Sequence, residues 1–159
     1  MTLLGIDPGK TIGWSLWTET GFEIARGTFA YEDIRSRLHV DEYGDHCLWF
    51  SYTSIIDGVK VVQYSDVRRM AIENYRGRPG QKNGGQQFWG PEALAKCELL
   101  GELAGIEVRR QEPSILKVSA LHAGYTLPKG HLPDQDSAYL HARYRLEELG
   151  VLRAKPLDS

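Results

Sequence analysis

The feature that most constrains the fold of this chain is its opening segment, where a short apolar run ends on a carboxylate. Residues 2–7 are almost wholly apolar and finish at Asp7. Gly9 and Gly13 allow the backbone to turn, and residues 12–18 then alternate like a second strand, so the two segments predict a β-hairpin. A charged side chain at the end of a buried strand is costly unless it is paired or holds a metal. Asp7 is therefore the first candidate functional residue.

Acidic residues stand at the edges of two further predicted elements. The segment 67–74, with its apolar run at 70–72, predicts a fourth strand that ends at Glu73, and Asp134 and Asp136 open a late helix. Acids at three separated points indicate a metal site suited to phosphate chemistry, since hard divalent cations prefer oxygen ligands. Three of the four acids also have a structural interpretation: Asp7 as a turn residue, and the two helix acids as capping groups.

Length and composition indicate an ordinary globular protein. With 159 residues, we expect a single domain over 1–152 and a frayed tail over 153–159. No apolar run is long enough to cross a membrane, and the opening strand leaves no room for a signal peptide. Cys47 and Cys97 have no partners at metal spacing and are expected as buried thiols on helix faces, which favours a reducing compartment. These features predict a cytoplasmic protein.

Charge is distributed unevenly along the chain, although the net charge is only −2. Basic residues gather in 67–90 and 109–129, where acids are few, whereas acids concentrate between 32 and 57. This polarity would let one face bind a phosphate backbone while the total stays near neutral. Composition alone also permits scattered, solvated surface charges. The five histidines show no zinc spacing, and most are expected at the surface or at helix caps.

The order of the predicted elements fits an α/β fold with a mixed sheet. The first hairpin is antiparallel, and right-handed helical crossovers then add the fourth and fifth strands beside the first, giving the order 3-2-1-4-5. In that layout Asp7 and Glu73 are expected at the same edge of the sheet, and the last helix brings Asp136 across it. The expected strands are 2–7, 12–18, 22–31, 67–74 and 106–110, and the expected helices are 46–63, 91–104, 113–123 and 134–149.

The chain resembles the RuvC-type Holliday junction resolvases of the ribonuclease H-like superfamily. The element order matches over residues 3–149, and the short length and the loop after Glu73 resemble the phage-borne members. Three segments carry the match: residues 5–9 together with Gly13 at the start, residues 71–73 in the middle, and residues 136–138 at the opening of the last helix. Pro113, Ser114 and Lys117, earlier in the chain than the third segment, also match.

The resemblance implies a homodimeric endonuclease with a five-stranded ribonuclease H-like sheet. Such an enzyme cuts four-way DNA junctions in two strands and uses two Mg²⁺ ions per active site, for which Mn²⁺ substitutes. The implied mechanism is in-line attack by an activated water, which leaves 5′-phosphate ends and needs no covalent intermediate. The partners would be branched DNA and a second copy of the chain, in a bacterial or phage-infected cell.

The resemblance also assigns four candidate residues for both catalysis and metal binding. Asp7 and Glu73 take the first two ligand positions, and Asp136 takes that of the helix acid. The family's other late acid lies one helical turn earlier, where this chain has a proline. Asp134 or His131 could replace it, and Asp134 is preferred because a second carboxylate suits Mg²⁺ better than an imidazole.

The segment after Glu73 is the strongest candidate for DNA contact because it is rich in glycine and basic residues. Its cations would bind the phosphate backbone, and an aromatic residue there could stack on an unpaired base. Lys117 and Lys129 are candidates for phosphate contact or for orienting water, although lone lysines are more often solvated. The predicted DNA-binding residues are Tyr75, Arg76, Arg78, Lys82, Lys117 and Lys129.

The leading expectation is a metal-dependent, structure-selective DNA endonuclease. A less selective nuclease for flaps, forks or RNA–DNA hybrids would use the same acids. A junction-binding module, in which the acids only cap and stabilise, belongs to another class. A sugar-kinase-like phosphotransferase also opens with an Asp-Gly hairpin, but this chain is too short for its two-domain nucleotide cleft.

Overall fold

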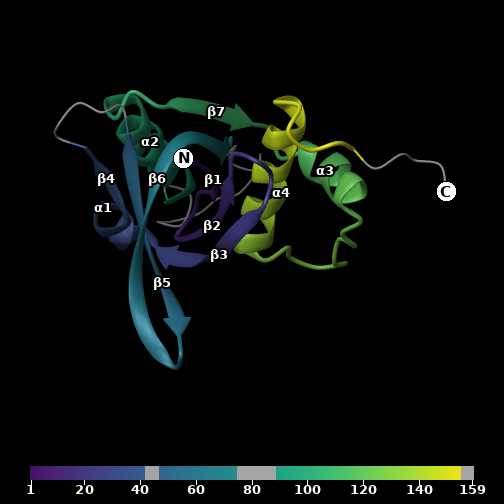
Figure 1. Ribbon diagram of the computed structural model, residues 1–159. Coiled ribbons are helices and arrows are strands. Elements are labelled where there is room, and N and C mark those ends of the chain that lie inside the picture. Colours follow the sequence, from purple (N-terminus) through teal and green to yellow (C-terminus); the bar gives the residue numbers. More distant parts are fainter. Residues whose placement is uncertain (42–46, 75–88, 155–159) are drawn as a thin grey trace.

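A computed structural model describes residues 1–41, 47–74 and 89–154 (Figure 1). Within these residues, seven strands form one mixed sheet and four α-helices pack around it. The strands are β1 (Thr2–Asp7), β2 (Thr11–Thr18), β3 (Glu23–Ala30), β4 (Leu38–Val40), β5 (Leu48–Ile56), β6 (Val59–Glu73) and β7 (Glu107–Gln111). The helices are α1 (Ile34–Arg37), α2 (Trp89–Leu103), α3 (Ile115–Ala123) and α4 (Asp134–Glu148), and a 3-10 turn, η1, spans Tyr31–Asp33.

The sheet has the order β3-β2-β1-β6-β5-β4, and β7 also pairs with β6. β1 is antiparallel to β2 and parallel to β6, which is in turn parallel to β7. The expected order 3-2-1-4-5 is confirmed, because the fourth and fifth expected strands are the second half of β6 and β7. No helix among the described residues is both long and apolar enough to cross a membrane.

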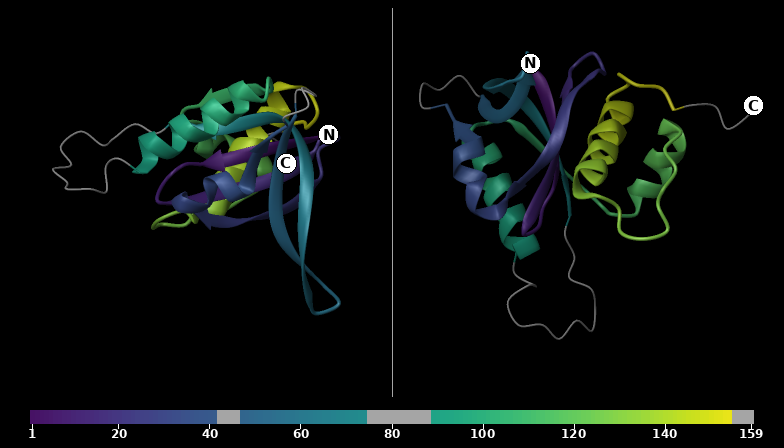
Figure 2. Two further views of the ribbon diagram at one scale, coloured as in Figure 1. Left: turned by 90° about the vertical axis from the view of Figure 1, so that its left-hand side faces the viewer. Right: turned by 90° about the horizontal axis from the view of Figure 1, so that it is seen from below.

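Helices cover both faces of the sheet (Figure 2): α1 and α2 lie on one face, and α3 and α4 lie on the other. Successive residues of a strand point to opposite faces. Leu4 and Ile6 of β1 therefore enter the main core with residues of α2, whereas Leu3 packs with residues of α4. By the same alternation, Gly5 and Asp7 belong to the α4 face of the sheet.

Two glycines allow α4 to approach the sheet closely. A Cβ atom at Gly5 would lie 2.3 Å from the carbonyl oxygen of Ala138, and one at Gly13 would lie 2.0 Å from that of Asp134. Both distances are far below van der Waals contact, so any side chain there would push the helix away. Gly13 lies inside β2, opposite Asp7, as the expected strand over 12–18 implies. It allows the N-terminus of α4 to rest against the end of β1.

The helix expected over 46–63 is wrong, because β5 and the first part of β6 form a hairpin there. Ile56 pairs with Val59 across the turn residues Asp57 and Gly58, which both have positive φ, at 52° and 77°. Asp-Gly between β-branched runs is a typical two-residue hairpin turn, and β-branched residues suit strands. The end of this hairpin projects beyond the rest of the sheet (Figures 1 and 2). Cys47 was expected on the face of this helix, and that expectation is wrong for the same reason. Its thiol is nevertheless buried, as expected.

Candidate metal centre

Asp7 and Glu73 end two neighbouring parallel strands at the centre of the sheet. Ile6 pairs with Ile72 in the register between β1 and β6, so the two carboxylates follow at the same edge. Both side chains belong to partly buried residues. The N-terminus of α4 crosses this edge, and Asp134 interacts electrostatically with both acids. The structure therefore places Asp7 and Glu73 at one edge of the sheet, with Asp134 within electrostatic range of both.

The acids interact unfavourably with one another. Burial, followed by repulsion from Glu73 and from Asp134, raises the pKa of Asp7 to about 8, although the neighbouring hydroxyl of Ser137 acts in the opposite direction. Burial also raises the pKa of Asp134; His131 opposes this shift and Glu73 adds to it. Burial and mutual repulsion thus disfavour the charged forms of Asp7 and Asp134, and a bound cation would favour them.

Residues of α4 and β7 hold the carboxylate of Glu73. The hydroxyl of Ser137 donates a hydrogen bond to Oε2 at 3.1 Å, and Nε2 of His141 lies 2.8 Å from the same oxygen. The other ring nitrogen of His141, Nδ1, lies 2.8 Å from Oε1 of Gln111 at the end of β7. His141 has no exposed surface, in contrast to the surface or capping position expected for most histidines.

Sequence reasoning missed His141 and Gln111, although one signal pointed to the histidine. Asp134, Ser137 and His141 are spaced at i, i+3 and i+7, which places them on one face of a helix. That face is the one that packs on the sheet. For Gln111 the sequence carried no such signal, because its role depends on the pairing of β7 with β6.

Asp136 points to a different part of the molecule. Its Oδ1 accepts a hydrogen bond from Nη1 of Arg26 at 2.9 Å, and its Oδ2 accepts one from the hydroxyl of Tyr125 at 2.8 Å. The guanidinium of Arg26 also lies over the ring of Tyr139, 4.0 Å from its centroid. These contacts tie the first turn of α4 to β3 and to the segment after α3. Residues two apart on a helix differ by about 200° in direction, so Asp134 and Asp136 do not face the same site.

The other predicted site residues are spread over the chain. His131 is exposed, and its Nε2 lies 3.6 Å from Oδ1 of Asp134. Lys117 on α3 and Lys129, between α3 and α4, are both exposed, and the structure gives neither a contact with the acids at the sheet edge. Four predicted DNA-binding residues lie outside the described residues: Tyr75, Arg76, Arg78 and Lys82.

The donor set at the sheet edge fits a magnesium ion. Within residues 1–41, 47–74 and 89–154, no three His, Cys, Asp or Glu side chains are arranged to hold an ion directly. Mg²⁺ does not need such a cage, because it keeps several waters and is commonly bound by one or two carboxylates and substrate phosphates. Asp7 and Glu73, with Asp134 beside them, provide donors of this kind.

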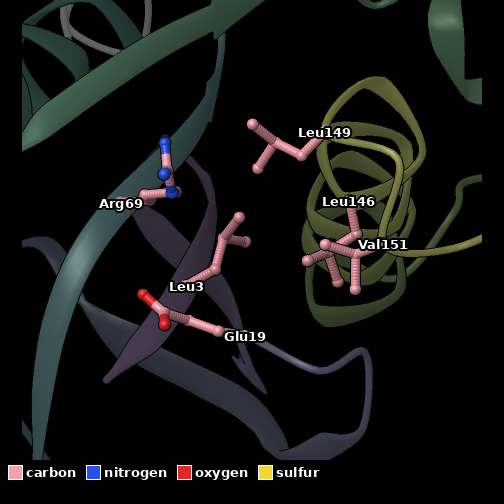
Figure 3. A pocket seen from close by; sticks show the side chains of 6 residues that line it. All are labelled: Leu3, Glu19, Arg69, Leu146, Leu149 and Val151. Atoms are coloured by element: carbon pink, nitrogen blue, oxygen red, sulfur yellow. The ribbon is translucent and has the colours of Figure 1, made fainter.

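A small cavity of about 220 Å³ lies at the other end of β1, between the sheet and the end of α4 (Figure 3). Its walls are mainly apolar, and Arg69 at its side is ion-paired with Glu107. Leu3, which lines the cavity, and Asp7 stand near opposite ends of β1, so the acids and the cavity are separate features. The lining residues are Leu3, Glu19, Arg69, Leu146, Leu149 and Val151.

Comparison with solved structures establishes the fold. The chain is similar to T. thermophilus RuvC in complex with a Holliday junction substrate, with a TM-score of 0.52 at 11% sequence identity, covering 95% of this chain and 97% of that one. It also aligns with a second Thermus thermophilus RuvC structure, with a TM-score of 0.43 at 12% identity, covering 95% and 98% of the two chains. No protein-family model and no curated protein sequence matches the chain. The match to the junction complex, together with the strand order of the sheet, shows that the protein has the ribonuclease H-like α/β fold of that RuvC structure.

Proposed function

We propose that this protein is a metal-dependent DNA endonuclease that hydrolyses phosphodiesters in branched DNA, chiefly in four-way junctions. The observation that carries the proposal is the meeting of Asp7, Glu73 and Asp134 at one edge of a RuvC-like sheet. The similar structure of T. thermophilus RuvC is a complex with a Holliday junction, which supports branched DNA as the substrate.

In this proposal Asp7, Glu73 and Asp134 hold Mg²⁺, or Mn²⁺ in its place, with two ions in each active site. When bound, these ions would activate water and neutralise the charge that develops on the phosphate in an in-line displacement. Ser137 and His141 orient Glu73. The product ends would be 5′-phosphates.

The structure makes Asp134 a stronger candidate than Asp136 for the acid contributed by α4. Asp136 would have to leave Arg26 and Tyr125 to reach the other acids. Asp134 already interacts electrostatically with Asp7. We therefore keep both in the proposal and assign Asp134 the direct role.

DNA contacts and dimer formation complete the proposal. The basic segment that follows Glu73 in the chain would contact DNA beside the cut site through Tyr75, Arg76, Arg78 and Lys82, and Lys117 and Lys129 would contact phosphates further away. A homodimer would provide two active sites for paired cuts. By the resemblance, the enzyme would be of the phage-borne type and would act in the cytoplasm of a bacterial or phage-infected cell.

A non-catalytic junction-binding module is the second candidate. The ion pair between Asp136 and Arg26 favours it, because one of the four predicted acids has a structural role there. A less selective nuclease of the same superfamily would differ from the leading proposal only in its substrates.

Cleavage of a labelled four-way junction in Mg²⁺, with fork and linear duplexes as controls, separates these candidates. Wild type is compared with Asp7→Asn and with Asp33→Asn, which changes an exposed acid of η1 in the same way. Cutting of the junction by wild type and Asp33→Asn, but not by Asp7→Asn, supports the resolvase. Binding without cutting by all three supports the module, and equal cutting of every substrate supports the broad nuclease.

A further inference from the structure

A buried chain of polar side chains leads from Glu73 into the interior between α4 and β7. His141 has 0% and Gln111 has 5% of its surface exposed. His141 bridges the two, with Nε2 at 2.8 Å from Oε2 of Glu73 and Nδ1 at 2.8 Å from Oε1 of Gln111. Buried polar groups persist when their hydrogen bonds are satisfied, and each of these groups has a partner.

Gln111 fixes the orientation of the His141 ring. Its amide nitrogen donates a hydrogen bond to Oε1 of Glu148 at 3.4 Å, so its amide oxygen is the acceptor that faces the ring. Nδ1 of His141 is therefore the donor to Gln111. Because a carboxylate only accepts, the contact of Nε2 with Oε2 of Glu73 is a hydrogen bond when both ring nitrogens carry a proton, and the two side chains then form an ion pair. The ring cannot rotate without breaking this bond, and Nε2 stays directed at Glu73.

Both hydrogen bonds that the described residues make to the carboxylate of Glu73 end on the same oxygen. Ser137 and His141 contact Oε2 from successive turns of α4. A carboxylate held through one oxygen keeps the other oxygen available for a further ligand. For Glu73, that oxygen is Oε1.

We infer that His141 and Gln111 are positioning residues that hold Glu73 through Oε2, so that Oε1 is the oxygen presented to a divalent cation. The inference rests on the proposed function for the presence of the cation. Groups that hydrogen-bond to metal ligands change metal affinity by about 10–100-fold when they are replaced. A histidine that only filled space in the core would have no such effect once the fold is intact.

The test is the affinity of the metal-free protein for Mn²⁺, measured by titration calorimetry. We expect His141→Leu to bind Mn²⁺ about 10–100-fold more weakly than wild type. His141→Gln, whose amide can donate to Oε2, is expected to recover much of that loss. The matched control is His122→Leu, because Nδ1 of His122 lies 2.8 Å from Oε2 of Glu147 in a similar pair between α3 and α4 that does not contact Glu73.

A second variant tests the same contact without changing α4. Gln111→Met keeps a side chain of similar volume in the core but removes the acceptor for Nδ1 of His141, and we expect at least tenfold weaker Mn²⁺ binding. Thermal unfolding followed by circular dichroism verifies that each variant is folded at the titration temperature. If His141→Leu does not fold, Gln111→Met decides the question.

The outcomes separate this inference from the proposed function. Wild-type affinity in folded His141→Leu and Gln111→Met overturns the positioning role alone, provided that wild type binds Mn²⁺ and Asp7→Asn does not. An equal loss in His122→Leu also overturns it, since the effect would then be general. Failure of wild type to bind Mn²⁺ overturns both the positioning role and the proposed metal centre.

Discussion

Replacing Asp7 by asparagine is expected to stabilise the metal-free protein at neutral pH while abolishing its proposed activity. Burial, together with the charges of Glu73 and Asp134, raises the pKa of Asp7 from 3.8 to about 8. The folded state therefore binds a proton that the unfolded chain releases above pH 4. Asparagine has nearly the same shape and carries no charge at any pH, so it removes this cost of folding.

The size of the effect follows from proton linkage. Because the folded state holds the extra proton, the contribution of Asp7 to the stability of wild type is most favourable below pH 4, falls as the pH rises through this window, and levels off above pH 8. Each pKa unit corresponds to about 1.4 kcal/mol, so three units between the unfolded pKa and pH 7 set an upper limit of roughly 4 kcal/mol. Asp7 is only partly buried, and solvent screening reduces this to roughly 2 kcal/mol, or a rise in melting temperature of about 4–8 °C.

The assay is thermal unfolding in EDTA between pH 4 and pH 9, for wild type, Asp7→Asn and the exposed control Asp33→Asn. We expect the Asp7→Asn curve to separate from wild type as the pH rises, and the Asp33→Asn curve to follow wild type. The reasoning is refuted if Asp7→Asn is no more stable than wild type at pH 7, or if its advantage is larger at pH 4 than at pH 8.

Three further predictions follow from the arrangement of the site. Asp134→Asn should reduce junction cleavage at least 100-fold with little loss of stability. Asp136→Asn should instead lower the free energy of unfolding by about 1–3 kcal/mol, because it weakens the contacts with Arg26. Cleavage assays and urea unfolding of both variants test this, and the reverse pattern would contradict the assignment. Gly13→Ala should lower the melting temperature and impair cleavage, since its methyl group would meet the carbonyl of Asp134. An unchanged melting temperature would show that α4 does not need to lie so close to β2. Mg²⁺ at 100 times its dissociation constant should stabilise wild type by about 2.7 kcal/mol. In a thermal-shift assay the melting temperature of Asp7→Asn should not change on addition of Mg²⁺, and equal shifts in both proteins would place the ion elsewhere.

The part of the fold that local sequence determines was predicted well. The opening hairpin and the strand that ends at Glu73 each show a clear apolar pattern, and the handedness of helical crossovers then places their ends together. The segment over 46–63 failed because apolar residues there match a helical spacing by coincidence. The Asp57-Gly58 pair was the better signal, since it specifies a two-residue hairpin turn.

The candidate site was predicted only in part because side-chain direction depends on how helices pack. Asp134 and Asp136 look equivalent in the sequence, but about 200° of helical rotation separates them, and packing of α4 against Gly13 decides which one faces Asp7. The contact of His141 with Glu73 joins residues far apart in the chain. No local pattern specifies such a contact, so the residues that hold the carboxylate became visible only in three dimensions.

The central claim is that Asp7 and Glu73, with Asp134, bind divalent cations at the end of β1 and β6. The most direct measurement is anomalous diffraction from crystals of the wild-type protein grown with Mn²⁺. We predict an anomalous peak within coordination distance of carboxylate oxygens of Asp7 and Glu73. Well-ordered crystals that contain millimolar Mn²⁺ but show no peak at this edge of the sheet would contradict the claim.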